Sequence, residues 1–477
     1  MLDYEKLPAL HQELLCNFLK PLNPNIDDLV IINCINAKLS HLLSSFRIQF
    51  LQNSNAEAKI INYYALSFAP SGVGKDKIYK ELEYHIFPEF RKVFDEKSES
   101  YKDRKSAEIQ LDAIKKFEDS KGEKDKIKYI QQETKAIRKL KYEITQGTQE
   151  GLNADCVAVS EAEFGSIFIK INELGMYLKN PTQTQELFIN SILGAYDGDI
   201  AVTTLKSENE YSEVKNLPIN CLLYSDSDEL LKDTAAKSLD SLFDAGLLRR
   251  SFVAYQPMGK IKEYEYINEE EVYAYAKGIL KPKVDAILNR MRPNRTLVLA
   301  EEAKKAYNNY INVNNNKYNK FFGLVSPSLL KELLGRHWKM LKLSCLLACV
   351  NHPDDCRINV QDINESIYLT EVFADTLKEF YSAEIKTDTD KLFEFFFKNI
   401  GQWITKTDIR KQKFASKNQF AKWFSDELET CADIAKAKGF ELQSEQFHNN
   451  SGVKYRLVAT PQPLVKADVF TDHNLTE

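Results

Sequence analysis

The sequence lacks the features of a membrane-spanning or secreted protein. Its longest late apolar run, residues 343–350, is far shorter than the roughly 20 residues that cross a bilayer. The amino-terminal stretch MLDYEKLPAL is acidic and has no apolar segment followed by small residues, so it does not match a secretion signal. The eight cysteines are scattered without paired spacing, which is typical of reduced thiols. We therefore expect a cytoplasmic protein without a membrane partner.

The chain also lacks a large excess of charge of either sign. Its formal net charge is -5, so any contact with nucleic acid must come from local basic patches and not from an overall field. We find no internal repeat, and the only low-complexity tract is the short asparagine cluster at 314–316. A length of 477 residues with 43% hydrophobic residues predicts two to four domains, each with its own core.

A glycine-rich turn, FAPSGVGKDK, follows an apolar run at 60–68 that is typical of a buried strand. A phosphate-binding loop needs glycines so that backbone N–H groups converge on the anion, then a lysine for the outer phosphates and a helix amino terminus. A helix is expected at 75–84. The sequence therefore predicts an ATP-binding loop made of Pro70, Ser71, Gly72, Val73, Gly74, Lys75 and Asp76.

This loop departs from the usual pattern at two positions. Ala69 replaces the first glycine, which is a mild change. Asp76 replaces the Ser or Thr whose hydroxyl contacts Mg²⁺. A carboxylate also ligates Mg²⁺, but it adds negative charge beside the phosphates unless the metal neutralises it. The alternative is a glycine-rich turn that holds no ligand.

Acidic residues follow a second run with strand character, DCVAVSEAEFG at 155–165. A P-loop ATPase needs a later strand that presents carboxylates to Mg²⁺ and to the attacking water. Residues two apart on a strand face the same side. We therefore assign Glu161, with Asp76, to the Mg²⁺ shell and Glu163 to the water, the alternative being surface carboxylates.

A third strand is expected in LPINCLLYSDSD at 217–228, and it ends at Ser225, our candidate for a residue that senses the terminal phosphate. The segment SLFDAGLLRRSFVAY then places Arg249 and Arg250 at the end of an apolar helix, before another strand. A guanidinium there suits an arginine finger that reaches a neighbour's nucleotide. The alternative is a solvated or ion-paired arginine pair.

This ordered set of motifs resembles a family of P-loop ATPases from phages, plasmids and mobile elements, of the helicase-like, primase-helicase carboxy-terminal type. The matching segments are APSGVGKD, GTQEGLNA (147–154), VSEAEFG, AYDGD (195–199), LPINCLLYSDSD and GLLRRSFV. The resemblance implies an α/β fold with a RecA-like or AAA+ core, ATP hydrolysis with Mg²⁺, and a ring, such as a hexamer, that moves on single-stranded DNA. A weaker match continues to about residue 375, where the resemblance suggests that Arg336 contacts nucleotide from a lid. A lid-core helix is the alternative.

The composition along the chain predicts five regions: an N-terminal helical region at 1–55, the ATPase core at 56–260, a helical lid at 261–387, a winged helix at 388–460 and a tail at 461–477. Residues 91–142 of the core are dense in charge and predict an exposed helical hairpin, either merely solvated or in contact with a partner or DNA. Thr405 is expected to cap a helix in the winged helix. Its basic residues Lys406, Arg410, Lys411, Lys413, Lys417 and Lys422 predict DNA contact, the alternative being protein contact.

Taken together, these features predict an ATP-dependent DNA replication helicase of a phage or mobile element, with other replication proteins as further partners. The alternative is a hydrolysis-weak, DNA-binding replication initiator or helicase loader, which Asp76 favours. A third and weaker alternative is a defence or regulatory ATPase.

Overall fold

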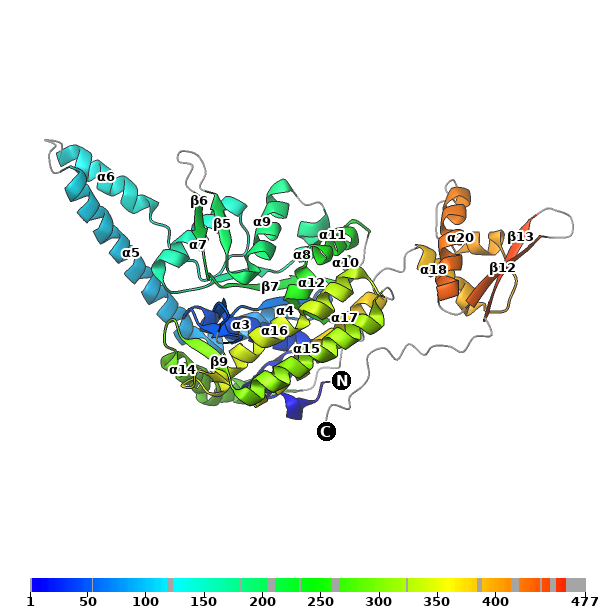
Figure 1. The fold of residues 1–477 in the computed structure, drawn as a ribbon, viewed down its shortest axis with the longest axis horizontal. Helices are drawn as coiled ribbons and strands as arrows, with labels where there is room; N and C mark the ends of the chain where they lie inside the picture. Colours follow the sequence, from blue (N-terminus) through cyan, green and yellow to red (C-terminus); the bar gives the residue numbers. More distant parts are fainter. Residues whose placement is uncertain are drawn as a thin grey trace. The chain divides into compact units, whose positions relative to one another are not determined.

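The computed structural model is an α/β protein that divides into two compact units, Met1–Leu377 and Lys378–Glu477 (Figure 1). It describes residues 2–53, 55–117, 123–179, 182–203, 211–230, 233–259, 266–322, 325–383, 388–412, 420–437, 440–446 and 452–459. The expected tail, 461–477, lies outside these residues. The three regions expected at 1–55, 56–260 and 261–387 belong to the first unit, apart from the last residues of the third.

The first unit is built around a parallel four-stranded sheet in the order β4-β7-β3-β8. Its strands are β3 (Tyr64–Phe68), β4 (Ile167–Ile171), β7 (Ile219–Ser225) and β8 (Ser251–Tyr255). Every residue of these strands is buried, as expected for a parallel sheet covered on both faces. The strand expected within 217–228 is confirmed by β7. The strand expected at 60–68 is confirmed only from Tyr64 onward, by β3, because Ile60 ends a short strand of another sheet and residues 61–63 lie between the two strands.

Helix α3 (Asp28–Ser44) packs against the middle of this sheet, and all its residues after Asp28 are buried. Asp27 caps its amino terminus by accepting a hydrogen bond from the N–H of Leu29. Inside the interface, the Asn33 amide donates to the carbonyl oxygens of Leu66 and Phe252, at 3.3 and 3.0 Å. These bonds connect the helix to β3 and β8 and so fix its position on the sheet.

The order of the strands creates a switch point between β3 and β7. After β3, the chain passes β7 and forms β4 at one end of the strand order. After β7, the chain passes β3 in the opposite direction and forms β8 at the other end. In open α/β sheets, ligands bind outside the carboxyl ends of the strands at such a point. This edge is therefore the first place to examine for a binding site.

A second, smaller sheet joins segments that are far apart in the sequence. Its order is β10 (Arg357–Ile358), β9 (Thr296–Leu299), β1 (Gln49–Leu51) and β2 (Lys59–Ile60). Because β1 pairs with β9, the N-terminal and helical regions form one structure and not separate domains. A separate hairpin pairs β5 (Ile200–Thr203) with β6 (Tyr211–Val214).

Helices make up most of the remainder of the first unit. Before the central sheet lie η1 (Tyr4–Lys6), α1 (Ala9–Leu14), η2 (Leu15–Leu19) and α2 (Lys20–Leu22). Between the strands lie α4 (Lys75–Glu81), η3 (Leu82–Ile86), α5 (Pro88–Lys116), α6 (Glu123–Ala136), α7 (Gln149–Ala162), α8 (Leu174–Lys179), α9 (Gln183–Gly194), η4 (Ala195–Asp197), α10 (Ser227–Leu230), α11 (Asp233–Asp244) and α12 (Leu247–Arg250). After them come α13 (Glu269–Tyr275), η5 (Ala276–Leu280), α14 (Lys281–Arg290), α15 (Glu301–Phe321), α16 (Pro327–Asn351) and α17 (Val360–Ala383).

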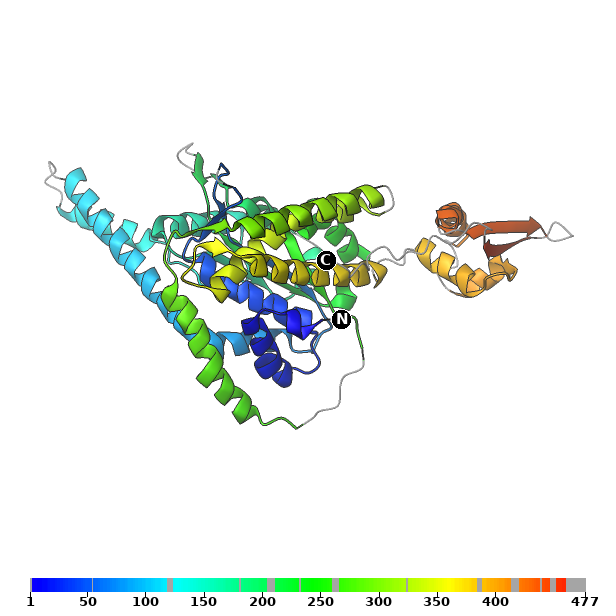
Figure 2. The ribbon, with the colours of Figure 1, turned by 60° about the horizontal axis from the view of Figure 1, so that its bottom comes forward.

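Helices α5 and α6 pack on each other where the charge-rich sequence predicts a hairpin. Both ribbon views show the pair extending away from the helices around the central sheet (Figure 1 and Figure 2). The break expected at 120–122 lies outside the described residues. No helix in the described part of the chain has the length and hydropathy that a membrane span requires.

The strand expected at 155–165 is wrong, because residues 155–162 belong to α7 and the last three residues follow it. Thr148 caps the helix by accepting a hydrogen bond from the N–H of Gly151 at 3.0 Å. Its buried residues Leu152, Cys156 and Val159 recur at helical spacing. The short VAV run fits a strand locally, but the capping residue and the longer apolar period decide for a helix.

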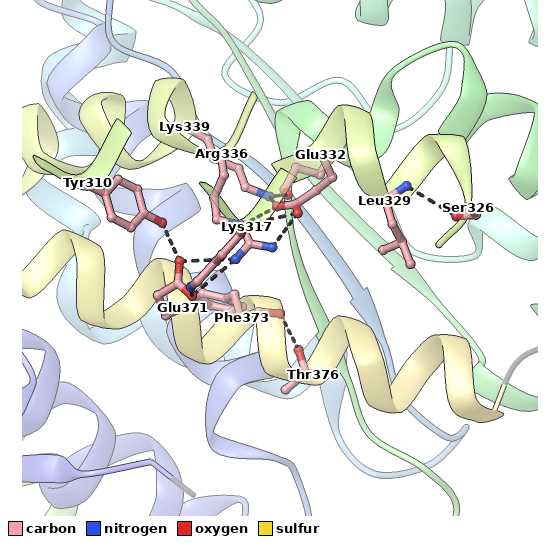
Figure 3. Close-up of polar contacts among 11 residues, drawn as sticks. Tyr310, Lys317, Ser326, Leu329, Glu332, Arg336, Lys339, Glu371, Phe373 and Thr376 are labelled. Atoms are coloured by element: carbon pink, nitrogen blue, oxygen red, sulfur yellow. Dashed lines mark hydrogen bonds and ion pairs between the residues drawn. The ribbon is translucent and has the colours of Figure 1, made fainter. Parts of the chain in front are cut away.

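A buried ion network holds the long helices together (Figure 3). Glu332 of α16 contacts Arg336 Nη2 and Lys339 Nζ, both at 2.7 Å, and Arg336 also contacts Glu371 of α17 at 3.2 Å. Burial raises the pKa of Glu332, but Arg336 and Lys339 outweigh burial and hold it below its ordinary value. Lys339 also donates to the carbonyl oxygen of Ser251 at 2.9 Å, which links α16 to the start of β8.

The network gives Arg336 a role in packing. Its guanidinium is buried and bonded to two carboxylates, so it supports the packing of helices, although its charge is not in water as the lid-core alternative expected. Glu371 forms ion pairs with both Arg336 and Lys317 of α15. Burial raises the pKa of Glu371, while Arg336 and Lys317 outweigh it and lower the value to about 2.

After the end of α17, the described residues of the second unit form three helices and an antiparallel sheet in the order β11-β13-β12. Its elements are α18 (Asp388–Lys398), β11 (Ile404–Thr405), α19 (Lys406–Lys411), α20 (Phe420–Ala437), β12 (Phe440–Gln446) and β13 (Val453–Ala459). Leu392, Phe396, Phe424 and Leu457 are among the residues of its own hydrophobic core. Thr405 caps α19 and forms a capping box with Asp408, as the sequence predicts.

We expect Glu332→Ala to lower the free energy of unfolding by about 3–5 kcal/mol, because it leaves Arg336 and Lys339 buried without their carboxylate. Urea unfolding followed by circular dichroism measures the change. Glu302→Ala, at an exposed position on α15, is the matched control and should change the value by less than about 0.5 kcal/mol. Equal effects of the two substitutions would contradict the role of the network.

Candidate functional site

The loop at 69–74 joins β3 to α4 at the switch point of the central sheet. Gly72 and Gly74 have φ angles of +82° and +103°, in the region that favours glycine. Gly74 is the residue immediately before α4, so its conformation turns the chain directly into the helix. The two glycines therefore provide the sharp turn that the sequence predicts.

Lys75, the first residue of α4, points back into the turn. Its side chain is only 8% exposed, and its ammonium donates to the carbonyl oxygens of Ala69 at 2.6 Å and Ser225 at 2.9 Å. Ala69 directly follows β3 and Ser225 ends β7, and the N–H of Ala69 donates to the same Ser225 oxygen at 3.1 Å. Lys75 thus binds the carboxyl ends of the two strands on either side of the switch point.

Three carboxylates influence this lysine. Burial lowers the pKa of Lys75, and Glu173, Asp226 and Asp76, in order of decreasing effect, oppose that shift. The three residues come from different segments, which follow β4, follow β7 and belong to α4 respectively. The fold therefore gathers these three carboxylates around the ammonium of Lys75 at one edge of the sheet.

Two of these segments are fixed by hydrogen bonds to the backbone. Asp226 accepts a hydrogen bond from the N–H of Ser71 at 2.8 Å, which holds the loop against the end of β7. The fully buried hydroxyl of Ser225 accepts from the N–H of Gly175 at 2.9 Å. Ser225 therefore positions the segment that follows Glu173, and in this state its oxygen bonds to the protein itself.

Asp76 is exposed beside the loop, and a lysine from β4 lies near it. Its carboxylate is 3.7 Å from the ammonium of Lys170, which is also 4.0 Å from Glu143 and 4.4 Å from the centre of the Tyr79 ring. Lys170 itself is buried. The negative charge that Asp76 adds to the loop is thus partly balanced by the protein.

Glu161 and Glu163 are not brought to the loop by any contact among the described residues. Glu161 lies on α7, where it accepts from the hydroxyl of Tyr101 at 2.9 Å and contacts Lys105 at 3.1 Å, both on α5. Glu163 caps the carboxyl end of α7 with a φ of +57°. The reason is the helical state of 149–162, which replaces the strand on which their assignment depended.

Sequence reasoning missed Asn172 and Glu173, which directly follow β4. The signal was the run IFIKI at 167–171, rich in β-branched residues and followed by Asn-Glu. We chose the preceding segment VAVSEAE in its place because that segment also has a short β-branched run and contains two glutamates. The side-chain oxygen of Asn172 is buried and has no hydrogen-bond partner among the described residues.

The oxygen atoms at this edge fit a magnesium ion that is bound together with phosphates. Mg²⁺ prefers oxygen ligands and is commonly held by one or two carboxylates, waters and substrate phosphates. Asp76 and Glu173, whose carboxylates influence Lys75, supply such oxygens, and Asn172 precedes Glu173 with a buried oxygen that has no partner among the described residues. Within the described ranges, no three acidic, histidine or cysteine side chains form a metal site by themselves, so the phosphates would have to complete it.

Arg249 and Arg250 lie at the other edge of the sheet. They immediately precede β8, which runs parallel to β3, so its five residues separate them by about 16 Å from the edge that holds the loop. Arg249 is exposed, and Arg250 is half-buried with its guanidinium 5.7 Å from the centre of the Tyr196 ring. The fold does not bring them to the loop of their own chain.

In the second unit, the basic residues expected to contact DNA are exposed wherever the structure describes them. Lys406, Arg410 and Lys411 lie on α19, and Lys422 lies on α20. Lys411 contacts Asp408 at 3.1 Å, and Lys406 lies 5.2 Å from the centre of the Phe424 ring. Lys413 and Lys417 lie outside the described residues.

No protein-family model matches the chain, and no curated protein sequence matches it either. The functional interpretation of the site therefore depends on its own geometry.

We expect Lys75→Ala to weaken ATP binding at least tenfold, because it removes the ammonium that donates to the chain at the carboxyl ends of β3 and β7. Lys77→Ala is the matched control, since Lys77 lies two residues further along α4 and donates instead to the carbonyl oxygen of Leu22 at 3.0 Å. Isothermal titration calorimetry with ATP and Mg²⁺ measures both variants. If both variants bound ATP as the parent does, Lys75 would not be part of a nucleotide site.

Proposed function

We propose that this chain is an ATPase that acts on DNA, and that it couples ATP hydrolysis to movement on single-stranded DNA as a replication helicase. The observation that supports this most is the position of Lys75. Its ammonium lies at the switch point of a parallel sheet, directly after two positive-φ glycines and at the start of a helix. Backbone N–H groups, a helix amino terminus and a lysine together are what a nucleotide's phosphates need.

The residues around the loop supply the remaining functions of hydrolysis. Lys75 exchanges its carbonyl partners for the outer phosphate oxygens, so its positive charge stabilises the transferring phosphoryl group. Glu173, which directly follows β4, orients the attacking water and replaces Glu163 in that role. Asp76 and Asn172 would hold a magnesium ion through their side-chain oxygens, and the ion would neutralise charge on the phosphates. Ser225 keeps the segment after Glu173 in place through Gly175.

Assembly into a ring, such as a hexamer, is supported by the position of the two arginines. Because Arg249 and Arg250 lie at the edge opposite their own loop, they are available to the nucleotide of a neighbouring copy. A guanidinium delivered from a neighbour stabilises charge on the transferring phosphoryl group. This arrangement makes hydrolysis depend on assembly.

DNA contact is supported by the second unit. In its described residues, α18, α19 and α20 and the three-stranded sheet follow the order of a winged helix, and α19 and α20 carry exposed cations. Such a cluster binds phosphates of the DNA backbone without regard to sequence. The unit therefore supplies the DNA-binding function that the net charge of the chain does not.

A second candidate is a DNA-binding initiator or helicase loader that binds ATP but hydrolyses it slowly. The pairing of Asp76 with Lys170 favours it, because the protein already balances this carboxylate without a metal. Strand displacement on a forked substrate separates the two functions, since only the helicase unwinds the fork by itself.

We expect Glu173→Gln to reduce ATP turnover by about 10²–10⁴-fold while ATP still binds, because the substitution removes the carboxylate that orients the water. Glu161→Gln is the control, since Glu161 contacts α5, and it should retain turnover close to the parent's. Steady-state ATP hydrolysis with and without single-stranded DNA measures both. The opposite order of effects would return the catalytic role to α7 and contradict the assignment of Glu173.

We expect simultaneous replacement of Lys406, Arg410, Lys411 and Lys422 by Ala to weaken DNA binding, because it removes four exposed cations. The slope of log affinity against log salt concentration should fall by about 0.9 for each phosphate of duplex DNA that the variant no longer neutralises. Fluorescence anisotropy with labelled DNA over a range of salt concentrations measures this. An unchanged affinity and slope would assign the second unit to protein contact.

A further inference from the structure

A cavity of about 340 Å³ lies beside the amino end of β8, between η4, the strands β1 and β2, and the helices α12 and α16. Its size is in the range of small-molecule sites. Four cations line it: Lys59, Arg249, Arg250 and Lys342. Among its lining residues Asp197 is the one carboxylate, and Glu57 lies 3.6 Å from Lys59. The cavity therefore carries more positive than negative charge.

Lys342 is the buried cation of this cavity, with only 4% of its surface exposed. Its ammonium donates to the Asn62 amide oxygen at 2.7 Å and to the carbonyl oxygen of Tyr196 at 2.9 Å, and lies 3.6 Å from the centre of the Tyr196 ring. No carboxylate contacts Lys342 among the described ion pairs. Burial lowers the pKa of Lys342 to about 7, with Asp197 and Cys345 opposing and Arg250 and Lys59 adding to the shift.

The two arginines are crowded together next to it. A Cβ atom at Gly246 would lie 2.6 Å from Arg250 Nη1 and 2.8 Å from Arg249 Nε, so both guanidinium groups pack over this glycine. A Cβ atom at Gly335 would lie 3.2 Å from Arg249 Cβ, so this glycine lets α16 approach α12 closely. Burial and the charge of Arg249 both lower the pKa of Arg250. Like charges held this close repel one another unless an anion joins them.

We propose that this cavity binds the phosphate group of a nucleotide, with Arg249, Arg250 and Lys342 as its cationic ligands and Trp338 and Tyr196 as its aromatic walls. Guanidinium groups match phosphate oxygens in geometry, and aromatic side chains suit a planar base. The nucleotide comes either from solution or from the loop of a neighbouring copy. Binding of a nucleotide held by a neighbouring copy rests on the proposed function, whereas binding of a nucleotide from solution does not.

The test is ATP binding by the Lys75→Ala variant, in which the loop no longer holds nucleotide. Calorimetry at pH 8 in two buffers of different ionisation enthalpy gives the affinity and the number of protons exchanged. Lys342 is mostly neutral at this pH, and a bound phosphate restores its charge, so we expect uptake of close to one proton per ATP. The ligand itself takes up few protons, since a phosphate loses its last proton near pH 6.

Lys342→Met in this background should weaken ATP binding at least tenfold and abolish the proton uptake. Lys305→Met, at an exposed position on the neighbouring α15, should change neither. Since Lys342 is buried and its replacement could affect folding, the exposed Arg249→Gln gives a second measure and should weaken binding at least fivefold.

The two sources give different results. Weakening by Lys342→Met and Arg249→Gln in the Lys75→Ala background supports a nucleotide taken from solution. Weakening only when the loop is intact, at protein concentrations at which the chain self-associates, supports a nucleotide held by a neighbouring copy. If both variants bind ATP as their parents do in both backgrounds, the proposal is wrong. Failure of the loop as a nucleotide site would appear separately, as unchanged ATP binding on Lys75→Ala alone.

Discussion

The two hydrogen bonds from Lys75 to the carbonyl oxygens of Ala69 and Ser225 are the interaction on which the candidate site depends. They require β3 and β7 to be adjacent and in register, and they require two glycines at positive φ so that α4 begins directly against the strand ends. Burial lowers the pKa of Lys75 and so favours its neutral form, whereas the surrounding carboxylates favour its charged form. An anion with more negative oxygens than two carbonyls would bind this ammonium more strongly.

The unusual Asp76 becomes understandable in this setting. A carboxylate at this position would repel phosphates if it stood alone, but Lys170 of β4 lies 3.7 Å away and Glu143 and Tyr79 hold that lysine. The same strand β4 leads directly to Asn172 and Glu173. One strand therefore supplies both the cation that balances the loop and the carboxylate that we assign to catalysis.

Local signals predicted the loop, β3, β7 and the Thr405 cap, because turn glycines, β-branched runs and capping residues act over a few positions. They failed at 155–165, where a short VAV run competed with the helical period that begins at Thr148. Because of this error, the sequence assigned to Glu163 the role that we now propose for Glu173. Strand β1 pairs with β9, and Arg250 and Lys342 line the same cavity. These residues are far apart in the sequence, so no local pattern predicts that they lie close together.

The central claim is that the edge formed by the ends of β3, β7 and β4 accepts a nucleotide's phosphates. Hydrogen–deuterium exchange of the full chain with and without ATP and Mg²⁺ tests it most directly, because amide groups that bind phosphate become protected. We expect slower exchange in residues 69–78 and 172–175, with little change in 149–162. Unchanged exchange at the loop with saturating ATP, or protection confined to α7, would contradict the account.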